Sequence, residues 1–193
     1  MTPENKTPLA WSSDGRFLLY ATLDPKTGPD LWALPLVGER KPFPVVQTPF
    51  EESAGQFSPD GRWLVYQSNE SGRMEIYVRP FPGPGDQWAV STAGGSQPRW
   101  RPDGKELFYV APDARLMAAP IGVAPDRQTL EPGTPVPLFS TRLASGSNIT
   151  GGFGSKAQYM VAPDGRFLMN VAVEGATPSP ITVVLNWDAG LKK

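Results

Sequence analysis

The chain has 193 residues, 39% of them apolar, and its 18 Lys and Arg side chains nearly balance 19 Asp and Glu. This apolar content is high enough for a folded core and argues against disorder, while the lack of a basic excess argues against binding to nucleic acid. Cys and His are both absent, which excludes disulfides, thiolate or imidazole metal sites, and catalytic triads that depend on either residue. We therefore predict no cofactor and no metal.

The sequence also shows no sign of a membrane span or a cleaved leader. Residues 1–6 lack the apolar stretch of a signal peptide, and no run approaches the roughly 18 apolar residues that a spanning helix needs. The 20 Gly and 23 Pro residues are distributed among short apolar runs instead. This pattern is typical of the turns of an all-β protein.

One nine-residue pattern occurs four times. An apolar residue stands directly before each copy, a basic residue follows the Gly of its Asp-Gly pair, and a Leu stands three positions after that Gly. The pairs recur at intervals of roughly 40–45 residues, with a longer last interval, and this is the period of four-stranded propeller blades. The four copies are Ser12–Tyr20, Ser58–Tyr66, Arg101–Tyr109 and Ala162–Asn170.

Each Asp-Gly pair is predicted to form the turn of a β-hairpin. Pro at the second turn position fixes φ at about −65°, Asp accepts local backbone hydrogen bonds, and Gly takes a positive φ that strains other residues. We therefore interpret the Asp residues as structural rather than as paired catalytic carboxylates. The predicted turn residues are Asp14, Gly15, Asp60, Gly61, Asp103, Gly104, Asp164 and Gly165.

A third and a fourth strand are predicted after each of the first three hairpins. The third-strand candidates are Leu31–Leu34, Glu75–Val78 and Leu116–Ala119. Each is followed by a Pro that is expected to end the strand, namely Pro35, Pro80 and Pro120. The fourth-strand candidates are Phe43–Gln47, Gln87–Ser91 and Val136–Phe139. The last repeat has one further candidate, Ile181–Trp187, so its blade is expected to have three strands.

The sequence therefore predicts an all-β protein with antiparallel sheets, organised as one partial β-propeller over residues 1–193. Its approximate blades are 8–50, 51–95, 96–144 and 156–193, with a flexible Gly-rich insertion at 145–155. The apolar runs after the turns do not alternate with polar residues, so both faces of a blade are expected to be covered. Since no strand is left to close a ring, we expect the partner to be the remaining blades of a larger propeller or another chain. Open blade edges favour self-association.

The repeated Trp/Phe-Ser-Pro-Asp-Gly-Arg unit and the later Ile-Tyr-Val strand at 76–78 resemble the WD-repeat-like β-propellers of the TolB type over essentially the whole chain. Segments 163–170 and 179–187 are similar to the propeller end of bacterial proteins that join a Ser/Thr protein kinase to such a propeller, often through a membrane span. The resemblance implies a sensing or docking part of a signalling protein, extracytoplasmic if membrane-anchored and otherwise cytoplasmic. The kinase motifs are absent from the sequence, so no kinase activity is implied.

Two sets of residues are candidates for contact with a ligand or partner. Gln56, Arg99 and Arg101 lie on predicted innermost strands, from which side chains can reach the channel of a propeller. If the blades repeat by rotation, the basic residues after the turns lie on one face and can gather an anionic partner. The alternative is a solvated charged rim, because each basic residue neighbours a turn Asp that cancels its field. These basic residues are Arg16, Arg62, Lys105 and Arg166. By contrast, Trp11, Trp63 and Trp100 are predicted to lie between blades rather than to form an aromatic platform.

Three functions remain open at this point. The first is a non-catalytic module that binds a protein, a peptide or a small ligand. The second is the propeller cap of a prolyl-oligopeptidase-type peptidase, whose Gly-x-Ser-x-Gly elbow and catalytic His are not in this chain. The third is a glycosidase-like or lactonase-like propeller, which needs carboxylates that converge on the channel. The sequence favours the first, because it has repeats without a catalytic set.

Overall fold

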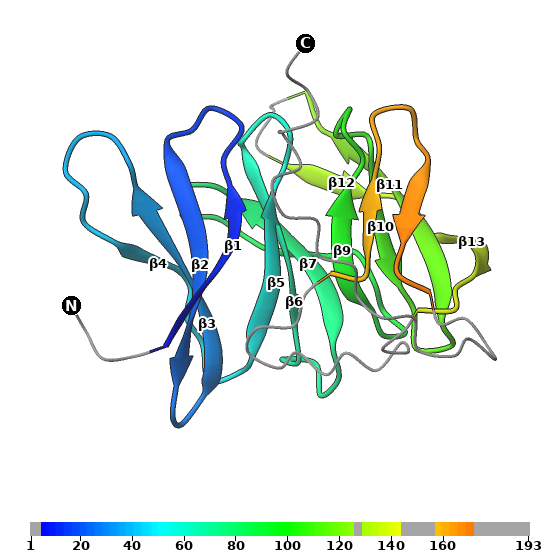
Figure 1. Cartoon of the computed structure of the whole chain (residues 1–193), viewed down its shortest axis with the longest axis horizontal. Coiled ribbons are helices and arrows are strands. Elements are labelled where there is room, and N and C mark those ends of the chain that lie inside the picture. Colours follow the sequence, from blue (N-terminus) through cyan, green and yellow to red (C-terminus); the bar gives the residue numbers. More distant parts are fainter. Residues whose placement is uncertain (1–4, 126–128, 144–156, 172–193) are drawn as a thin grey trace, which may run out of the picture.

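The computed structural model describes residues 5–125, 129–143 and 157–171, and every regular element in this part of the chain is a β-strand (Figure 1). The strands pair antiparallel in four sheets that follow one another along the chain. The all-β antiparallel class predicted from the sequence is thus confirmed. These residues include no helix long and apolar enough to cross a membrane.

Sheets 1 and 2 are meanders in which each strand pairs with the next. Sheet 1 consists of β1 (Lys6–Trp11), β2 (Phe17–Asp24), β3 (Gly28–Pro35) and β4 (Phe43–Val46). Sheet 2 consists of β5 (Glu52–Phe57), β6 (Trp63–Ser68), β7 (Glu75–Pro80) and β8 (Trp88–Ala89). The third and fourth strands predicted for these repeats are confirmed, and Pro35 and Pro80 end their strands as expected.

Sheet 3 has the four predicted strands and one that was not predicted. It consists of β9 (Ser96–Trp100), β10 (Glu106–Val110), β11 (Arg115–Val123), β12 (Leu130–Pro132) and β13 (Val136–Ser140). The expectation that Pro120 ends the third strand is wrong, because β11 continues to Val123 and pairs there with β12. Pro120 lacks a backbone N–H group to donate, but it keeps its carbonyl acceptor. Its carbonyl accepts a hydrogen bond from the Gly133 amide at 2.8 Å, and the next side chain, Ile121, is buried against sheet 2.

Sheet 4 is described only as the hairpin of β14 (Tyr159–Val161) and β15 (Phe167–Met169). The insertion predicted at 145–155 and the strand predicted at Ile181–Trp187 lie outside the described residues. The hairpin packs on sheet 3, where the ring of Phe167 contacts that of Phe108 at a centroid distance of 4.9 Å.

The strand register of sheet 4 differs from that of the other sheets. In sheet 2, Phe57 pairs with Leu64, whereas in sheet 4 the equivalent Val161 pairs with Phe167, one residue earlier. A one-residue shift moves every side chain of a strand to the opposite face. Leu168 is accordingly 72% exposed, although its repeat equivalent Leu64 is fully buried. The Leu position that the repeat aligns therefore has a different role in the last copy.

The Asp-Gly turns have the conformation predicted for them. Their glycines have positive φ angles, +70° at Gly15, +70° at Gly61, +74° at Gly104 and +83° at Gly165. In sheet 2 the Ser58 hydroxyl donates to the Asp60 carboxylate and accepts from the Trp63 amide at 3.0 Å. The same carboxylate oxygen accepts from the Arg62 amide at 3.1 Å. The turn Asp is thus occupied by local hydrogen bonds.

The sheets lie side by side in sequence order, so that the interior sheets have neighbours on both faces (Figure 1). On β6, Leu64 and Tyr66 pack against sheet 1, while Trp63 and Val65 pack against sheet 3. Every residue of this strand is buried. The predicted coverage of both faces is confirmed here, and it explains why the strand has no polar alternation.

The first sheet does not share this environment on both sides. Trp100 is buried between sheets 2 and 3, but its repeat equivalent Trp11 is 64% exposed. The prediction that Trp11 lies between blades is therefore wrong for the described chain. The physical reason is that this position faces the preceding sheet in sheets 2 and 3, whereas sheet 1 is the first sheet among the described residues.

The turn glycines provide a test of the repeat unit. An added Cβ at Gly61 meets nothing within 4 Å, so substitution to Ala introduces only the backbone strain of a positive φ. We expect Gly61→Ala to lower the free energy of unfolding by about 1 kcal/mol, measured by denaturant titration. Gly61→Asn should lose less, since Asn tolerates this conformation. The control is Gly122→Ala in β11, where φ is not positive; equal losses at both positions would contradict the turn assignment.

Candidate functional site

The innermost-strand candidates each have a partner within the fold. The Gln56 side-chain carbonyl accepts a hydrogen bond from the Trp100 amide at 3.0 Å and so joins sheet 2 to sheet 3. Arg101 forms an ion pair with Glu106 at 2.6 Å and lies 3.4 Å from the Asp103 carboxylate. A contact between these side chains and a ligand stays a prediction.

Arg99 lies on β9 in a more enclosed place. Its Nη1 donates to the Pro98 carbonyl at 2.7 Å. Burial lowers the pKa of the Arg99 guanidinium, and the neighbouring Tyr159 of sheet 4 opposes this shift. Arg99 is thus close to the boundary between sheets 3 and 4.

The basic residues that follow the turns have different surroundings. Arg16 lies over the ring of Phe17, with 5.7 Å from Cζ to the ring centroid, and Arg166 pairs with Asp164 at 2.7 Å. Arg62 and Lys105 line two separate cavities, both of which Trp63 also lines. An anionic site shared by all four stays a prediction.

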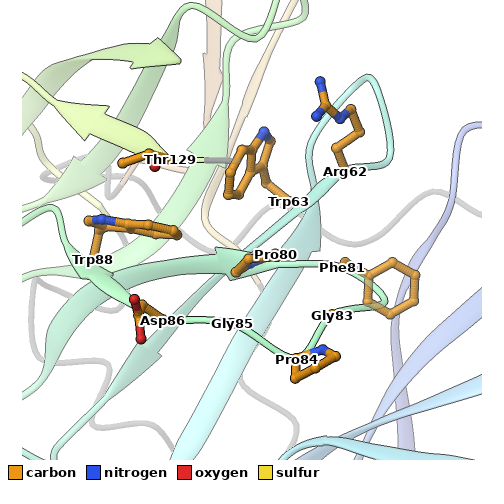
Figure 2. A pocket seen from close by; sticks show the side chains of 10 residues that line it. All are labelled: Arg62, Trp63, Pro80, Phe81, Gly83, Pro84, Gly85, Asp86, Trp88 and Thr129. Carbon is orange, nitrogen blue, oxygen red and sulfur yellow. The ribbon is translucent and has the colours of Figure 1, made fainter. Parts of the chain in front are cut away.

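The larger of these two cavities, of about 480 Å³, is our candidate functional site and is named here the Trp63–Trp88 cavity (Figure 2). Its size falls within the range of small-ligand pockets. It lies where the segment between β7 and β8 approaches sheet 3. Its lining residues are Arg62, Trp63, Pro80, Phe81, Gly83, Pro84, Gly85, Asp86, Trp88 and Thr129.

The segment that forms one wall of the cavity is anchored by Phe81. This ring inserts between sheets 1 and 2, with centroid distances of 4.7 Å to Phe57, 5.0 Å to Phe17 and 6.3 Å to Phe43. The contacts with Phe17 and Phe57 are edge-to-face, a geometry that aromatic pairs favour. The seam between the first two sheets therefore determines where the cavity wall begins.

Two glycines allow the same segment to fold back on the end of β7. A Cβ on Gly83 would lie 2.9 Å from the Pro80 carbonyl oxygen, and one on Gly85 would lie 2.7 Å from Cγ of the same Pro. Both distances are shorter than van der Waals contact. Any larger residue at either position would push the segment away from β7 and change the shape of the cavity.

The cavity combines aromatic surface with two opposite charges. Trp63 and Trp88 contact each other edge-to-face, with 5.7 Å between centroids and an interplanar angle of 78°. Trp63 is buried and its indole Nε1 has no hydrogen-bond partner. Arg62 and Asp86 lie at the margin (Figure 2). Such a site can pack a flat or ring-shaped apolar group against indole and orient it by charge or hydrogen bonding.

Of these residues, only Arg62 was predicted from the sequence to contact a ligand or partner, whereas Trp63 was predicted to lie between blades. The signal for the rest was the dense Pro-Phe-Pro-Gly-Pro-Gly run at 80–85 followed closely by Trp88. Such a run between two strands is a loop with restricted conformation. It has no counterpart in the other repeats, which is why alignment of the copies passed over it.

A buried carboxyl group lies elsewhere, at the start of β5. Glu52 is fully buried, and its Oε2 has no hydrogen-bond partner. The pKa of Glu52 is raised to about 7, chiefly by desolvation; a hydrogen bond from the Thr48 hydroxyl opposes this shift, and the nearby Asp30 carboxylate contributes to it. The residues that the structure describes contain no group of three or more carboxylates placed to hold a metal ion.

With this geometry in place, comparison with solved structures identifies the fold. The chain matches TolB from Agrobacterium tumefaciens (20% identity, TM-score 0.50, 70% of this chain and 50% of that chain). It matches TolB from Acinetobacter baumannii (19% identity, TM-score 0.50, 90% and 44%). It also matches a puromycin-hydrolysing peptidase of Mycobacterium tuberculosis (17% identity, TM-score 0.55, 81% and 26%). No protein-family model and no curated protein matches the sequence.

These matches show that the chain has the fold of a partial β-propeller of the TolB type. It spans about half the length of the TolB structures and about a quarter of the peptidase. At these identities the likeness concerns the fold alone.

The buried carboxyl group predicts a pH dependence of stability. The pKa of Glu52 is about 7 in the folded protein against an ordinary 4.5, so the folded state binds this proton more tightly than the unfolded chain. The group's favourable contribution is therefore complete below about pH 4.5 and is lost as the pH rises through 7. In Glu52→Gln, the free energy of unfolding should fall less between pH 5 and 8, and the variant should be more stable than the parent at pH 8.

Denaturant titrations at several pH values measure this difference. The control is Glu39→Gln, which changes an exposed carboxylate and should leave the pH profile unaltered. Identical profiles for the parent and Glu52→Gln would show that Glu52 is already ionised and solvated at neutral pH.

Proposed function

We propose that this chain is a non-catalytic β-propeller module that binds a protein, a peptide or a small ligand through the Trp63–Trp88 cavity. The observation that carries the proposal is the cavity itself, which joins two indoles and two opposite charges in a volume of about 480 Å³. Aromatic residues and Arg are the side chains that contribute most to binding energy in protein interfaces. The cavity also lies where one repeat differs from the others, as a specific site requires.

The absence of His and Cys from the whole sequence supports a binding role rather than catalysis. The Asp residues of the turns, which are the most regularly placed carboxylates, accept hydrogen bonds from their own turns. The turn Asp residues thus have a structural role, and no cluster of carboxylates suited to general acid–base chemistry was predicted from the sequence.

The larger protein that we propose is a bacterial signalling protein in which a Ser/Thr kinase is linked to the propeller. The similarity of the C-terminal segments to such proteins supports this, as does the chain's span of about half a TolB structure. In that setting the cavity senses or docks a partner, and its occupancy is reported to the linked kinase.

The alternative is the propeller of a prolyl-oligopeptidase-type peptidase, which the match to the puromycin-hydrolysing peptidase favours. The two proposals differ in what the same reading frame encodes beyond this chain. A kinase domain with an apolar span supports the first, and a hydrolase domain with a Gly-x-Ser-x-Gly elbow and a catalytic His supports the second.

Site-specific cross-linking tests the cavity as a binding site. We expect a photoreactive p-benzoylphenylalanine at position 86, in cells that express the protein naturally, to form a defined cross-linked product. Adding Trp88→Ala should reduce this product about tenfold, because truncation of a central aromatic contact typically costs at least 1–2 kcal/mol of binding. The yield is measured by mass spectrometry, and thermal unfolding confirms that the variant is folded.

The matched control places the same probe at Val37, which is 70% exposed and lies between β3 and β4, away from the cavity. Equal products from positions 86 and 37, or a yield that Trp88→Ala leaves unchanged, would contradict the cavity as the binding site.

A further inference from the structure

A second cavity adjoins the Trp63–Trp88 cavity, since Trp63 lines both of them. It has a volume of about 280 Å³, lies between the Asp-Gly turns of sheets 2 and 3, and is named here the turn cavity. Its lining residues are 58–60, 103–105, Trp63, Trp100, Ile121 and Val123. Sheets 2 and 3 each have a described sheet on both sides, so the turn cavity does not depend on where the described chain begins or ends.

The turn cavity lies where the repeat copies differ. The turns of sheets 1 and 2 are joined directly, because the Ser13 hydroxyl donates to the Pro59 carbonyl at 2.9 Å. Pro59 is itself the equivalent of Ser13 in the second copy and has no hydroxyl to donate to the turn of sheet 3. In addition, the continuation of β11 past Pro120 places Ile121 and Val123 beside this opening. The cavity is therefore specific to one pair of sheets and is not a general feature of the repeat.

The buried lining of the turn cavity is apolar and aromatic. Trp63 and Trp100 are each 4% exposed, and Ile121 is also buried. Neither indole Nε1 has an acceptor among the described residues, and in Figure 2 the nitrogen-bearing edge of Trp63 points away from Trp88. Indole rings attract cations more strongly than other aromatic rings do. The methylene stems of long basic side chains pack well on apolar surface of this kind.

The exposed margin of the turn cavity carries two carboxylates, Asp60 and Asp103, against the single ammonium group of Lys105. One oxygen of each Asp accepts a hydrogen bond from an amide of its own turn, at 3.1 Å for Asp60 and 3.0 Å for Asp103. The other oxygen of Asp60 has no partner among the described residues. Arg101 lies 3.4 Å from Asp103 but pairs more closely with Glu106, at 2.6 Å. Both turns thus keep a carboxylate oxygen that can face a cation.

We propose that the turn cavity holds the Lys or Arg side chain of an extended peptide whose ring-shaped or apolar side chain occupies the Trp63–Trp88 cavity. The methylene stem of the basic residue packs on the indoles and on β11, and its charged head lies between Asp60 and Asp103. In an extended peptide the side chains of residues i and i+2 share one face and lie about 7 Å apart, so one strand can fill two cavities that share an indole. The inference rests on the proposed binding function and adds the chemical class of the partner.

The experiment follows the indole N–H signals of the whole chain by NMR during titration with two acetylated and amidated tripeptides, Phe-Gly-Lys and Phe-Gly-Gln. We expect the Lys peptide to shift the signals of Trp63, Trp88 and Trp100. It should bind about threefold more tightly than the Gln peptide, because ion pairs at an exposed margin make a modest contribution. Raised salt should remove this preference, since it screens exposed charges.

Two substitutions test the carboxylates directly. Asp60→Asn and Asp103→Asn keep an oxygen that accepts the hydrogen bonds of the turn, and Asn is well tolerated in turns. Each should reduce the preference for the Lys peptide, and the double variant should abolish it without changing the affinity for the Gln peptide. The matched control is Asp14→Asn, which changes the same turn position in the first copy and lines neither cavity. Thermal unfolding checks that every variant is folded.

The outcomes separate this inference from the proposed function. Equal affinity for the two peptides, with shifts at Trp88 but not at Trp100, would overturn the basic subsite and leave the Trp63–Trp88 cavity as a binding site. Shifts at Trp100 without shifts at Trp88 would support the subsite and contradict the proposed function. If millimolar concentrations of either peptide shift no indole signal, the peptide class is wrong, and cross-linking from position 86 still tests the Trp63–Trp88 cavity by itself.

Discussion

The structure depends on the packing of one sheet face against the next. The strands that follow the Asp-Gly turns are apolar on both faces. A sheet covered on only one face would therefore leave its other apolar face exposed to water. Stacking removes both faces of β6 from water, and every one of its residues is buried. At roughly 25 cal/mol per Å² of apolar area, this burial is the main force that holds the sheets in a row. The turns and ion pairs contribute little to stability in comparison.

The contacts between neighbouring sheets differ from one seam to the next, and this difference produces the candidate site. In the seam between sheets 2 and 3, glutamine side-chain carbonyls also accept hydrogen bonds from backbone amides of β9: Gln67 accepts from Gln97, and Gln56 accepts from Trp100. The first seam has Ala21 and Ala10 at the equivalent positions and is filled with Phe rings instead. One of them, Phe81, comes from the segment after β7. The residue that closes the seam therefore also fixes the wall of the Trp63–Trp88 cavity.

The sequence was sufficient to predict the features that the repeat copies share. The turn glycines, the third and fourth strands of sheets 1 and 2 and the burial of Trp63 and Trp100 all follow from a pattern whose copies have the same surroundings. It was insufficient to predict burial where equivalent residues of different copies have different neighbours. Trp11 matches Trp100 in the pattern but lies on the first sheet that the structure describes, and Leu168 matches Leu64 but lies in a hairpin whose register is shifted by one residue. Neither difference is encoded in the residue itself.

The candidate site was missed for a related reason. The position of the segment 81–86 depends on the contact of Phe81 with Phe17 of the neighbouring sheet and on the close approach of two glycines to Pro80 at the end of β7. An alignment of the repeat copies compares equivalent positions and does not detect such contacts. Likewise, the continuation of β11 past Pro120 depends on the pairing partner that β12 supplies. Function on a repeat scaffold is thus best sought in the places where the copies depart from one another.

Native-state amide hydrogen exchange tests the dependence on stacking most directly. Local openings cost least where few apolar contacts must be broken. We expect the amides of β6 and β10, which have sheets on both faces, to exchange most slowly and only through global unfolding. The amides of β1 and of the β14–β15 hairpin should exchange faster, in proportion to their uncovered faces. Uniform protection across all four sheets, or slowest exchange in sheet 1, would contradict it.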